Sequence, residues 1–281
     1  MAIFWHRALG GVISRWVATL IGWGYAVSHP RVLEAIRDNI ALLDKSMATR
    51  RNAIGLCIQQ ALNFREYAEL WRIRRTPEKV LSKIGSRHGL EHIEAAYAKG
   101  KGCLLVTGHL GYFELGGLIM SQMGYPVVTL TLPEPSDTLT GWRADFRKIW
   151  GVETVVVGAD AFSAVEITRA LARGALVALL ADRPFDGNTV PVELPYGRIP
   201  FSTSPVLVSL LSGAPIVPVG ITREPDGRFR VEAAPQICPE WLPEGRPATF
   251  EKFTRELAES GLVPMFCNSP DQWHHYHRLT L

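Results

Sequence analysis

The chain has 281 residues, of which 47% are hydrophobic and 20% charged, and its formal net charge is +3. This length suffices for one large α/β domain or two small ones, and the composition excludes a disordered chain, which would be poor in apolar residues and rich in charge. The small, diffuse charge gives no support for nucleic-acid binding, and the four scattered cysteines indicate free thiols in a reducing compartment rather than disulfides or a zinc site.

The N-terminal segment, residues 2–27, is mostly apolar but is interrupted by polar side chains, among them Arg15. An arginine near the middle of a spanning helix costs about 2.5–3.5 kcal/mol in insertion experiments, whereas tryptophan suits the lipid–water interface. We expect residues 1–29 to form a membrane-associating helix that ends before Pro30, because the residue before a proline disfavours helix. A single spanning helix and a helix packed on the protein's own core are the alternatives.

The next stretch, residues 30–101, has apolar residues at the three- and four-residue spacing of helices. Residues 31–101 carry fourteen Lys and Arg against eight Asp and Glu. An anionic membrane surface attracts such a segment by roughly 1 kcal/mol per basic residue, and a solvated helical face is the alternative. We predict a helical region that packs on the core.

From residue 102 onward, short apolar runs alternate with helical patterns. The alternation indicates a single, mostly parallel central sheet flanked by helices, and so an α/β fold class. Residues 30–281 are predicted to form one domain, with the α/β core at 102–281. The buried strands are expected at 103–107, 127–132, 154–157, 176–181 and 216–221, an edge strand at 228–233, and helices at 113–123, 138–150, 162–172 and 204–211.

Candidate chemistry lies where the first of these strands ends, which is where open parallel sheets form active sites. His109 follows the strand almost directly, and Glu114 comes five residues later. Glycines at 108 and 111 permit a turn that would bring the two side chains together. A carboxylate bonded to one imidazole nitrogen leaves the other free to take a proton, so the pattern predicts a His109–Glu114 dyad. A polar strand end followed by a glutamate at a helix start, favoured by the helix dipole, is the alternative.

The pattern His109-x4-Glu114 resembles the H-x4-D/E signature of the lysophospholipid acyltransferase superfamily. The glutamate is typical of the branch that contains bacterial lipid A secondary acyltransferases and mycobacterial phosphatidylinositol mannoside acyltransferases. Arg183 stands where the lipid A enzymes mostly have glutamine, which leaves the acceptor open. The resemblance extends from about Trp16 to Trp273, and its further blocks are residues 147–151, 181–200, 213–219 and 270–273.

This resemblance implies transfer of a fatty acyl chain from acyl carrier protein or coenzyme A to a hydroxyl of a membrane lipid or glycolipid. An alcohol needs a general base at neutral pH, and a thiol with a pKa near 8.5 leaves readily. His109 would be that base, held by Glu114, with no metal and no cofactor. We expect the enzyme at the cytoplasmic face of the inner membrane. A thioesterase or lipid hydrolase using water, and a non-catalytic membrane module, are the alternatives.

The same resemblance implies substrate-binding residues. Arg147 and Arg183 are candidates for donor phosphates, which a guanidinium binds in a forked geometry, and Asp182 could orient Arg183 or a substrate hydroxyl. Gly197 and Arg198 are the other predicted contacts. As alternatives, Arg147 caps a helix C-terminus, Asp182 and Arg183 form a surface ion pair, and Gly197 shapes its loop.

Three histidines near the C-terminus, His274, His275 and His277, are a weaker signal of metal binding. No cysteine or acidic residue lies near them at ligand spacing, so we predict a solvated tail and no metal site. Neither G-x-G-x-x-G nor G-x-S-x-G is present, which leaves dinucleotide binding and a serine hydrolase mechanism unsupported.

Overall fold

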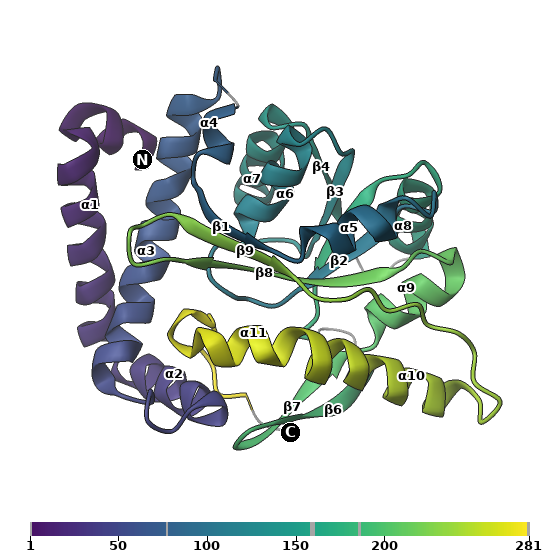
Figure 1. Cartoon of the computed structure of the whole chain (residues 1–281). Helices are drawn as coiled ribbons and strands as arrows, with labels where there is room; N and C mark the ends of the chain where they lie inside the picture. Colours follow the sequence, from purple (N-terminus) through teal and green to yellow (C-terminus); the bar gives the residue numbers. More distant parts are fainter. Residues whose placement is uncertain (1, 77, 158–160, 185–186, 280–281) are drawn as a thin grey trace.

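A central sheet organises the molecule (Figure 1), of which the computed structural model describes residues 2–76, 78–157, 161–184 and 187–279. Within these residues, the strands of the sheet are β1 (Ile84–His88), β2 (Cys103–Thr107), β3 (Val127–Thr131), β4 (Val152–Val156), β5 (Leu176–Leu180), β8 (Ile216–Arg223) and β9 (Phe229–Ala233). Their order is β1-β9-β8-β2-β5-β3-β4. All neighbouring pairs are parallel except β8 with β9, which confirms the predicted mostly parallel α/β sheet.

Helices cover both faces of this sheet. The helices of the described residues are α1 (Ala2–Ser28), α2 (Pro30–Leu43), α3 (Arg50–Ile73), α4 (Glu78–Leu81), α5 (Leu90–Tyr97), α6 (Glu114–Gln122), α7 (Asp137–Ile149), α8 (Ala161–Ala172), α9 (Ser204–Ser212), α10 (Arg246–Arg255) and α11 (Val263–Asn268). A π-helical segment, η1 (Glu256–Leu262), joins α10 to α11, and the 3-10 turn η2 (Pro270–Gln272) follows. A separate antiparallel hairpin pairs β6 (Thr189–Leu194) with β7 (Gly197–Ser202).

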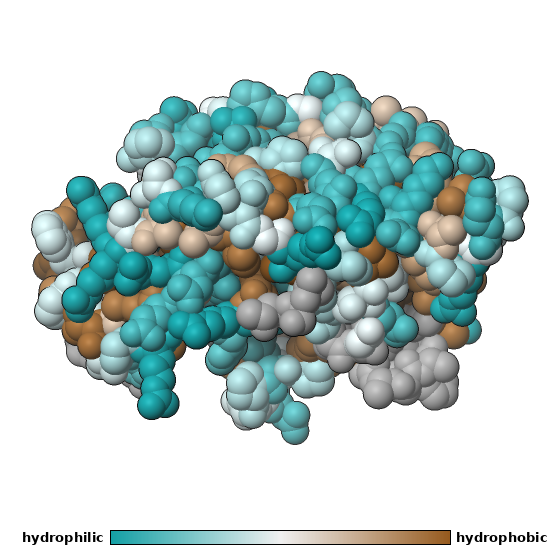
Figure 2. All heavy atoms as spheres, turned by 90° about the horizontal axis from the view of Figure 1, so that it is seen from below, coloured by the Kyte–Doolittle hydropathy of each residue, from teal (hydrophilic) through white to brown (hydrophobic). Residues whose placement is uncertain are grey.

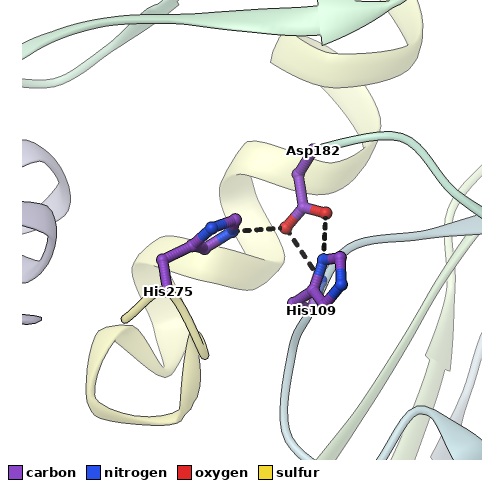
Figure 3. A group of neighbouring side chains, drawn as sticks. All are labelled: His109, Asp182 and His275. Atoms are coloured by element: carbon purple, nitrogen blue, oxygen red, sulfur yellow. Dashed lines mark hydrogen bonds and ion pairs between the residues drawn. The ribbon is translucent and has the colours of Figure 1, made fainter. Parts of the chain in front are cut away.

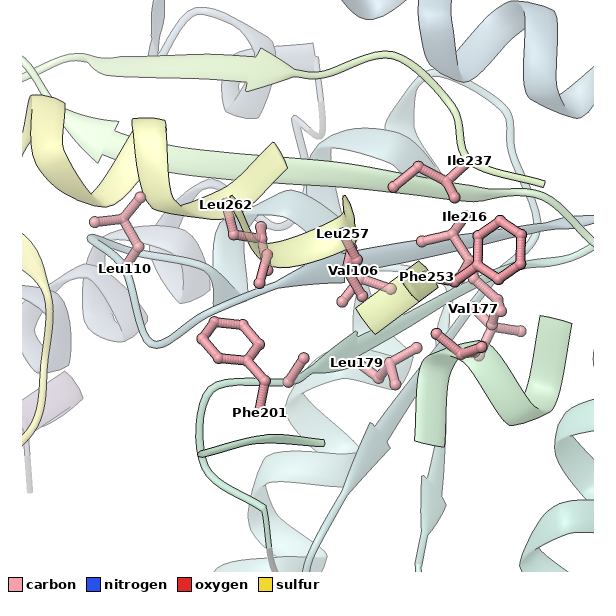
Figure 4. Packing of buried hydrophobic residues seen from close by; sticks show 14 of the residues in the cluster. Val106, Leu110, Val177, Leu179, Phe201, Ile216, Ile237, Phe253, Leu257 and Leu262 are labelled. Atoms are coloured by element: carbon pink, nitrogen blue, oxygen red, sulfur yellow. The ribbon is translucent and has the colours of Figure 1, made fainter. Parts of the chain in front are cut away.

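Alternate residues of β2 enter two different cores, because successive side chains of a strand point to opposite faces. Leu104 and Val106 pack with residues of α8, α9 and the α10–α11 segment, part of which Figure 4 shows. Cys103 and Leu105 pack with residues of α3, α5, α6 and α7. The strand that leads to His109 is therefore buried on both faces, and this rigid element positions the loop that follows it.

The N-terminal helix α1 lies along α3 (Figure 1). It ends at Ser28 and α2 begins at Pro30, which confirms the predicted break. Over residues 11–28 its buried side consists of small residues, Ser14, Ala18, Gly22 and Ala26, and a Cβ at Gly22 would lie only 2.5 Å from the Ile58 Cα. Among the described residues, no helix combines the length and apolar character needed to cross a bilayer.

Two predictions about secondary structure are wrong. The segment 228–233 was expected at a sheet edge, but β9 lies between β1 and β8. The edge strand β1 lies within the stretch 30–101 that was expected to be helical; its sequence, IGSRH, is half exposed and polar, so it carries no apolar alternation. The division into segments 1–29, 30–101 and 102–281 stays a prediction.

Candidate active site

His109 lies in the loop between β2 and α6, at the carboxyl end of the strand. Two glycines let this loop approach its surroundings closely. A Cβ at Gly108 would lie 2.7 Å from Asp182 Oδ2, and Gly111 has φ +56°, with a Cβ there only 1.9 Å from the Ile221 carbonyl oxygen. These close approaches explain why glycine fits at both positions, whereas the sequence had suggested only that the two glycines permit a turn toward Glu114.

The carboxylate that meets His109 is Asp182, which follows β5 (Figure 3). His109 Nδ1 lies 2.7 Å from Asp182 Oδ1, and the His109 backbone N–H donates to Asp182 Oδ2 at 2.8 Å. The strands β2 and β5 are parallel neighbours, with Thr107 opposite Leu180, so their carboxyl ends adjoin. Asp182 is 1% exposed, whereas the His109 side chain keeps 21% of its surface exposed.

Asp182 accepts two further hydrogen bonds at Oδ2, from Trp273 Nε1 and from His275 Nε2, each at 2.9 Å. Burial alone would raise the pKa of Asp182, but the interactions with His109 and His275 outweigh it and hold that pKa well below its usual range. An ionised Asp182 accepts the Nδ1 proton of His109. Within the described part of the chain, His109 Nε2 has no hydrogen-bond partner, so this nitrogen is free to take a proton.

The predicted contact between His109 and Glu114 is not formed, which corrects the dyad expected from the sequence. Glu114 is the first residue of α6 and accepts hydrogen bonds from Arg147 Nε, from Arg147 Nη2 at 3.0 Å and from Arg143 Nη2 at 3.1 Å. Burial raises the pKa of Glu114, but the bond to Arg147 and the charge of Arg143 more than offset it, so the net pKa is lowered. Glu114 therefore links α6 to α7 beside the His109 loop.

Arg147 was predicted to bind donor phosphates, with a charge at a helix C-terminus as the alternative, and its role in substrate binding stays a prediction. It lies in the last turn of α7 but is only 4% exposed, and its guanidinium is directed to Glu114. Arg143 is a partner that sequence reasoning missed. It lies one helical turn earlier, at the i, i+4 spacing that places two side chains on one helix face, and that spacing was the available signal.

Arg183 directly follows the buried Asp182 in the chain and is itself exposed. Its Nη2 donates to the backbone oxygen of His274 at 3.3 Å. A surface ion pair between Asp182 and Arg183 is excluded, because Asp182 is buried and its oxygens serve other donors.

Gly197 and Arg198 lie on the β6–β7 hairpin. A Cβ at Gly197 would be 2.5 Å from Leu42 Cδ2, which supports its loop-shaping alternative. Arg198 Nε pairs with Glu193 at 2.8 Å, and both side chains are more than half exposed. No contact among the described residues joins either of them to His109, so their predicted role in substrate binding stays a prediction.

The expectation of a solvated C-terminal tail is wrong for two of its three histidines. His274 and His275 are 3% and 1% exposed, and only His277 is exposed. The backbone N–H of His274 donates to the His109 carbonyl at 2.7 Å, and His274 Nε2 lies 2.9 Å from the Gly111 carbonyl oxygen. Burial lowers the pKa of His274 to about 3, so this ring is neutral and holds the loop as a donor.

Three of these side chains could also bind a metal ion, because one ligand atom each of His109, Asp182 and His275 lies within 4.8 Å of the other two. Two imidazoles and a carboxylate form a donor set that transition metals accept. The separations of 2.7 and 2.9 Å are those of hydrogen bonds, and an ion would have to displace both imidazole protons, since ligands must be deprotonated. The prediction of no metal stays a prediction.

Two comparisons with known proteins bear on the family of the chain. No curated protein matched the chain. A family model, described as bacterial lipid A biosynthesis acyltransferase, matches residues 2–280. Because this match spans nearly the whole chain, the protein is an acyltransferase that belongs to the bacterial lipid A biosynthesis acyltransferase family.

Proposed function

We propose that the protein transfers a fatty acyl chain from an acyl thioester to a hydroxyl of a membrane lipid or glycolipid, with His109 as the general base. The observation that carries the proposal is the hydrogen bond between His109 Nδ1 and the buried, ionised Asp182. In the neutral ring this bond places the proton on Nδ1, so the lone pair of Nε2 lies on a partly exposed ring. Membership of an acyltransferase family supplies the class of reaction.

In this mechanism the acceptor hydroxyl donates a hydrogen bond to His109 Nε2. As the hydroxyl oxygen attacks the thioester carbonyl carbon, Nε2 takes its proton, and Asp182 stabilises the resulting imidazolium. The tetrahedral intermediate then re-forms the carbonyl and breaks the carbon–sulfur bond. The thiolate leaves and recovers the proton from His109, so the products are an ester and a free thiol. In this mechanism the protein supplies the base, His109, and the carboxylate that orients it, Asp182.

Product analysis tests this function. The purified enzyme is given a radiolabelled acyl thioester, carried either by acyl carrier protein or by coenzyme A, together with a glycolipid fraction. We expect label in a new lipid ester that depends on the lipid acceptor, and the faster of the two donors identifies the carrier. Release of labelled free fatty acid alone, at a rate independent of acceptor, would instead show hydrolysis by the same pair with water.

We also propose that α1 lies in the interface of the inner membrane, on its cytoplasmic face. Val12, Trp16, Leu20 and Trp23 are 52–72% exposed, and their three- and four-residue spacing places them on one helix face. Figure 2 shows hydrophobic surface among polar residues on the left, the side on which α1 lies in Figure 1. The small-residue side already packs on α3, so the large apolar side is the one available to lipid.

The double variant Trp16→Ser/Trp23→Ser is expected to lower binding to anionic vesicles at least about tenfold, because burying each large apolar side chain contributes roughly 1.5–3 kcal/mol. Co-sedimentation with the vesicles measures this. Trp241→Ser is the matched control, since Trp241 is 53% exposed but lies outside α1, and it should bind as wild type does. Equal binding by the double variant and wild type would remove α1 from the membrane contact.

A further inference from the structure

We propose that His275 is a positioning residue for acyl transfer, which acts by holding Asp182 in the orientation that serves His109. The inference rests on the proposed mechanism and adds to it a residue from the C-terminal segment, far from both partners in sequence. Figure 3 shows the three side chains together, with Asp182 between the two imidazoles.

The hydrogen bonds of Asp182 are distributed unequally between its two oxygens. Oδ2 accepts from the His109 backbone N–H, from Trp273 Nε1 and from His275 Nε2, at 2.8–2.9 Å. Among the described residues, Oδ1 accepts only from the His109 ring, at 2.7 Å. The three donors at Oδ2 fix the rotation of the carboxylate, and this rotation directs Oδ1 to His109 Nδ1.

Of the two side chains that donate to Asp182 Oδ2, His275 is the one whose hydrogen bond can be tested without disturbing the hydrophobic core. Trp273 also fills volume, since its indole stacks on Phe266 with ring centroids 5.2 Å apart. His275 is 1% exposed, so it is buried away from substrate, and any effect it has on the reaction must pass through its neighbours. Its ring lies edge-on to His109, with centroids 5.4 Å apart.

A donor at Oδ2 also spreads the negative charge of the carboxylate. When this donor is lost, Asp182 becomes a stronger acceptor and stabilises the imidazolium form of His109 further, so the acid limb of the pH–rate profile moves to higher pH. The other titratable groups facing this cluster are His274 and Arg183. Neither changes in the experiment below.

The test compares two replacements of matched length, His275→Gln, which keeps a donor, and His275→Met, which lacks one. We expect His275→Met to lower kcat about tenfold, the size of effect that one hydrogen bond to a charged group supports, with KM nearly unchanged and the acid limb shifted to higher pH. His275→Gln should restore kcat to within about twofold and the acid limb to its wild-type position. Circular dichroism and the unfolding midpoint show whether each variant is folded. If His275→Met does not fold, His275→Phe, which also lacks a donor, replaces it.

Two outcomes overturn the inference. One is wild-type kcat in the folded variant that lacks the donor. The other is equal loss in the glutamine and methionine variants with an unmoved acid limb, which would mark His275 as merely structural. In the Asp182→Asn background, His275→Met should lower kcat less than about twofold further, because its effect passes through that carboxylate. If the Asp182→Asn enzyme kept wild-type activity, the proposed mechanism itself would be refuted. If Asp182→Asn lost activity but His275→Met behaved as wild type, only the role of His275 would be refuted.

Discussion

His109→Ala is expected to lower kcat for acyl transfer at least about 100-fold, the lower end of what a positioned general base contributes. The variant removes the Nε2 atom that takes the proton of the acceptor hydroxyl. It also removes the imidazole ring that Asp182 orients. Donor binding should be largely kept, because the proposed role of His109 is proton transfer. Initial rates of labelled ester formation measure the loss.

Folding must be kept for this result to count. The backbone N–H of His109 still bonds Asp182 in the alanine variant, so we expect a stability loss of about 1–3 kcal/mol, the cost of one missing partner of a charged group. His277→Ala is the control, since its side chain is exposed in the C-terminal segment, and it should transfer acyl chains at the wild-type rate. A folded His109→Ala enzyme with unchanged turnover would exclude His109 as the base.

The place of the site was predictable from the sequence. The run at 103–107 is apolar up to its last residue, Thr107, which is typical of a strand covered on both faces, and the strand observed there has the same bounds. Parallel sheets form sites at their carboxyl ends, so His109 was found without knowledge of the topology. Gly108 and Gly111 drew attention to this loop as well, although the structure shows that they serve close packing and not a contact between His109 and Glu114.

The partner of His109 was predicted wrongly, because proximity in sequence was taken for proximity in space. Asp182 is 73 residues away and reaches His109 only because β5 lies beside β2 in the sheet. Strand order does not follow from apolar periodicity. Asp182 nevertheless directly follows the predicted strand 176–181, so the rule that located His109 applied to it as well.

The C-terminal contribution could not be inferred for a different reason. Trp273, His274 and His275 have no helical or strand periodicity, and histidine is intermediate in its tendency to be buried. Their burial comes from tertiary contacts, namely backbone hydrogen bonds with the His109 loop and side-chain bonds to Asp182. Only the assembled sheet makes this segment part of the site.

A comparison of the two carboxylates decides between the predicted and the observed partner of His109. Asp182→Asn keeps the size of the side chain and an oxygen acceptor, but an amide nitrogen placed toward His109 Nδ1 cannot accept its proton. The ring is then held in the wrong tautomer, with its proton on Nε2. We expect kcat to fall about 10³–10⁴-fold, as for the corresponding change in a Ser-His-Asp triad, with KM changed little.

Glu114→Gln should behave differently, because Glu114 pairs with Arg143 and Arg147 and not with His109. Breaking a buried ion pair by removing one charge costs about 3–5 kcal/mol of unfolding free energy, so the principal effect is on stability. At low temperature, where the variant is folded, kcat should stay within about tenfold of wild type, since the proposed base and its partner are intact. Urea unfolding and kcat, measured on both variants, separate the two roles. If Glu114→Gln lost activity as severely as Asp182→Asn while remaining stable, Glu114 would have to reach His109 during turnover, and the contact predicted from the sequence would belong to the catalytic state.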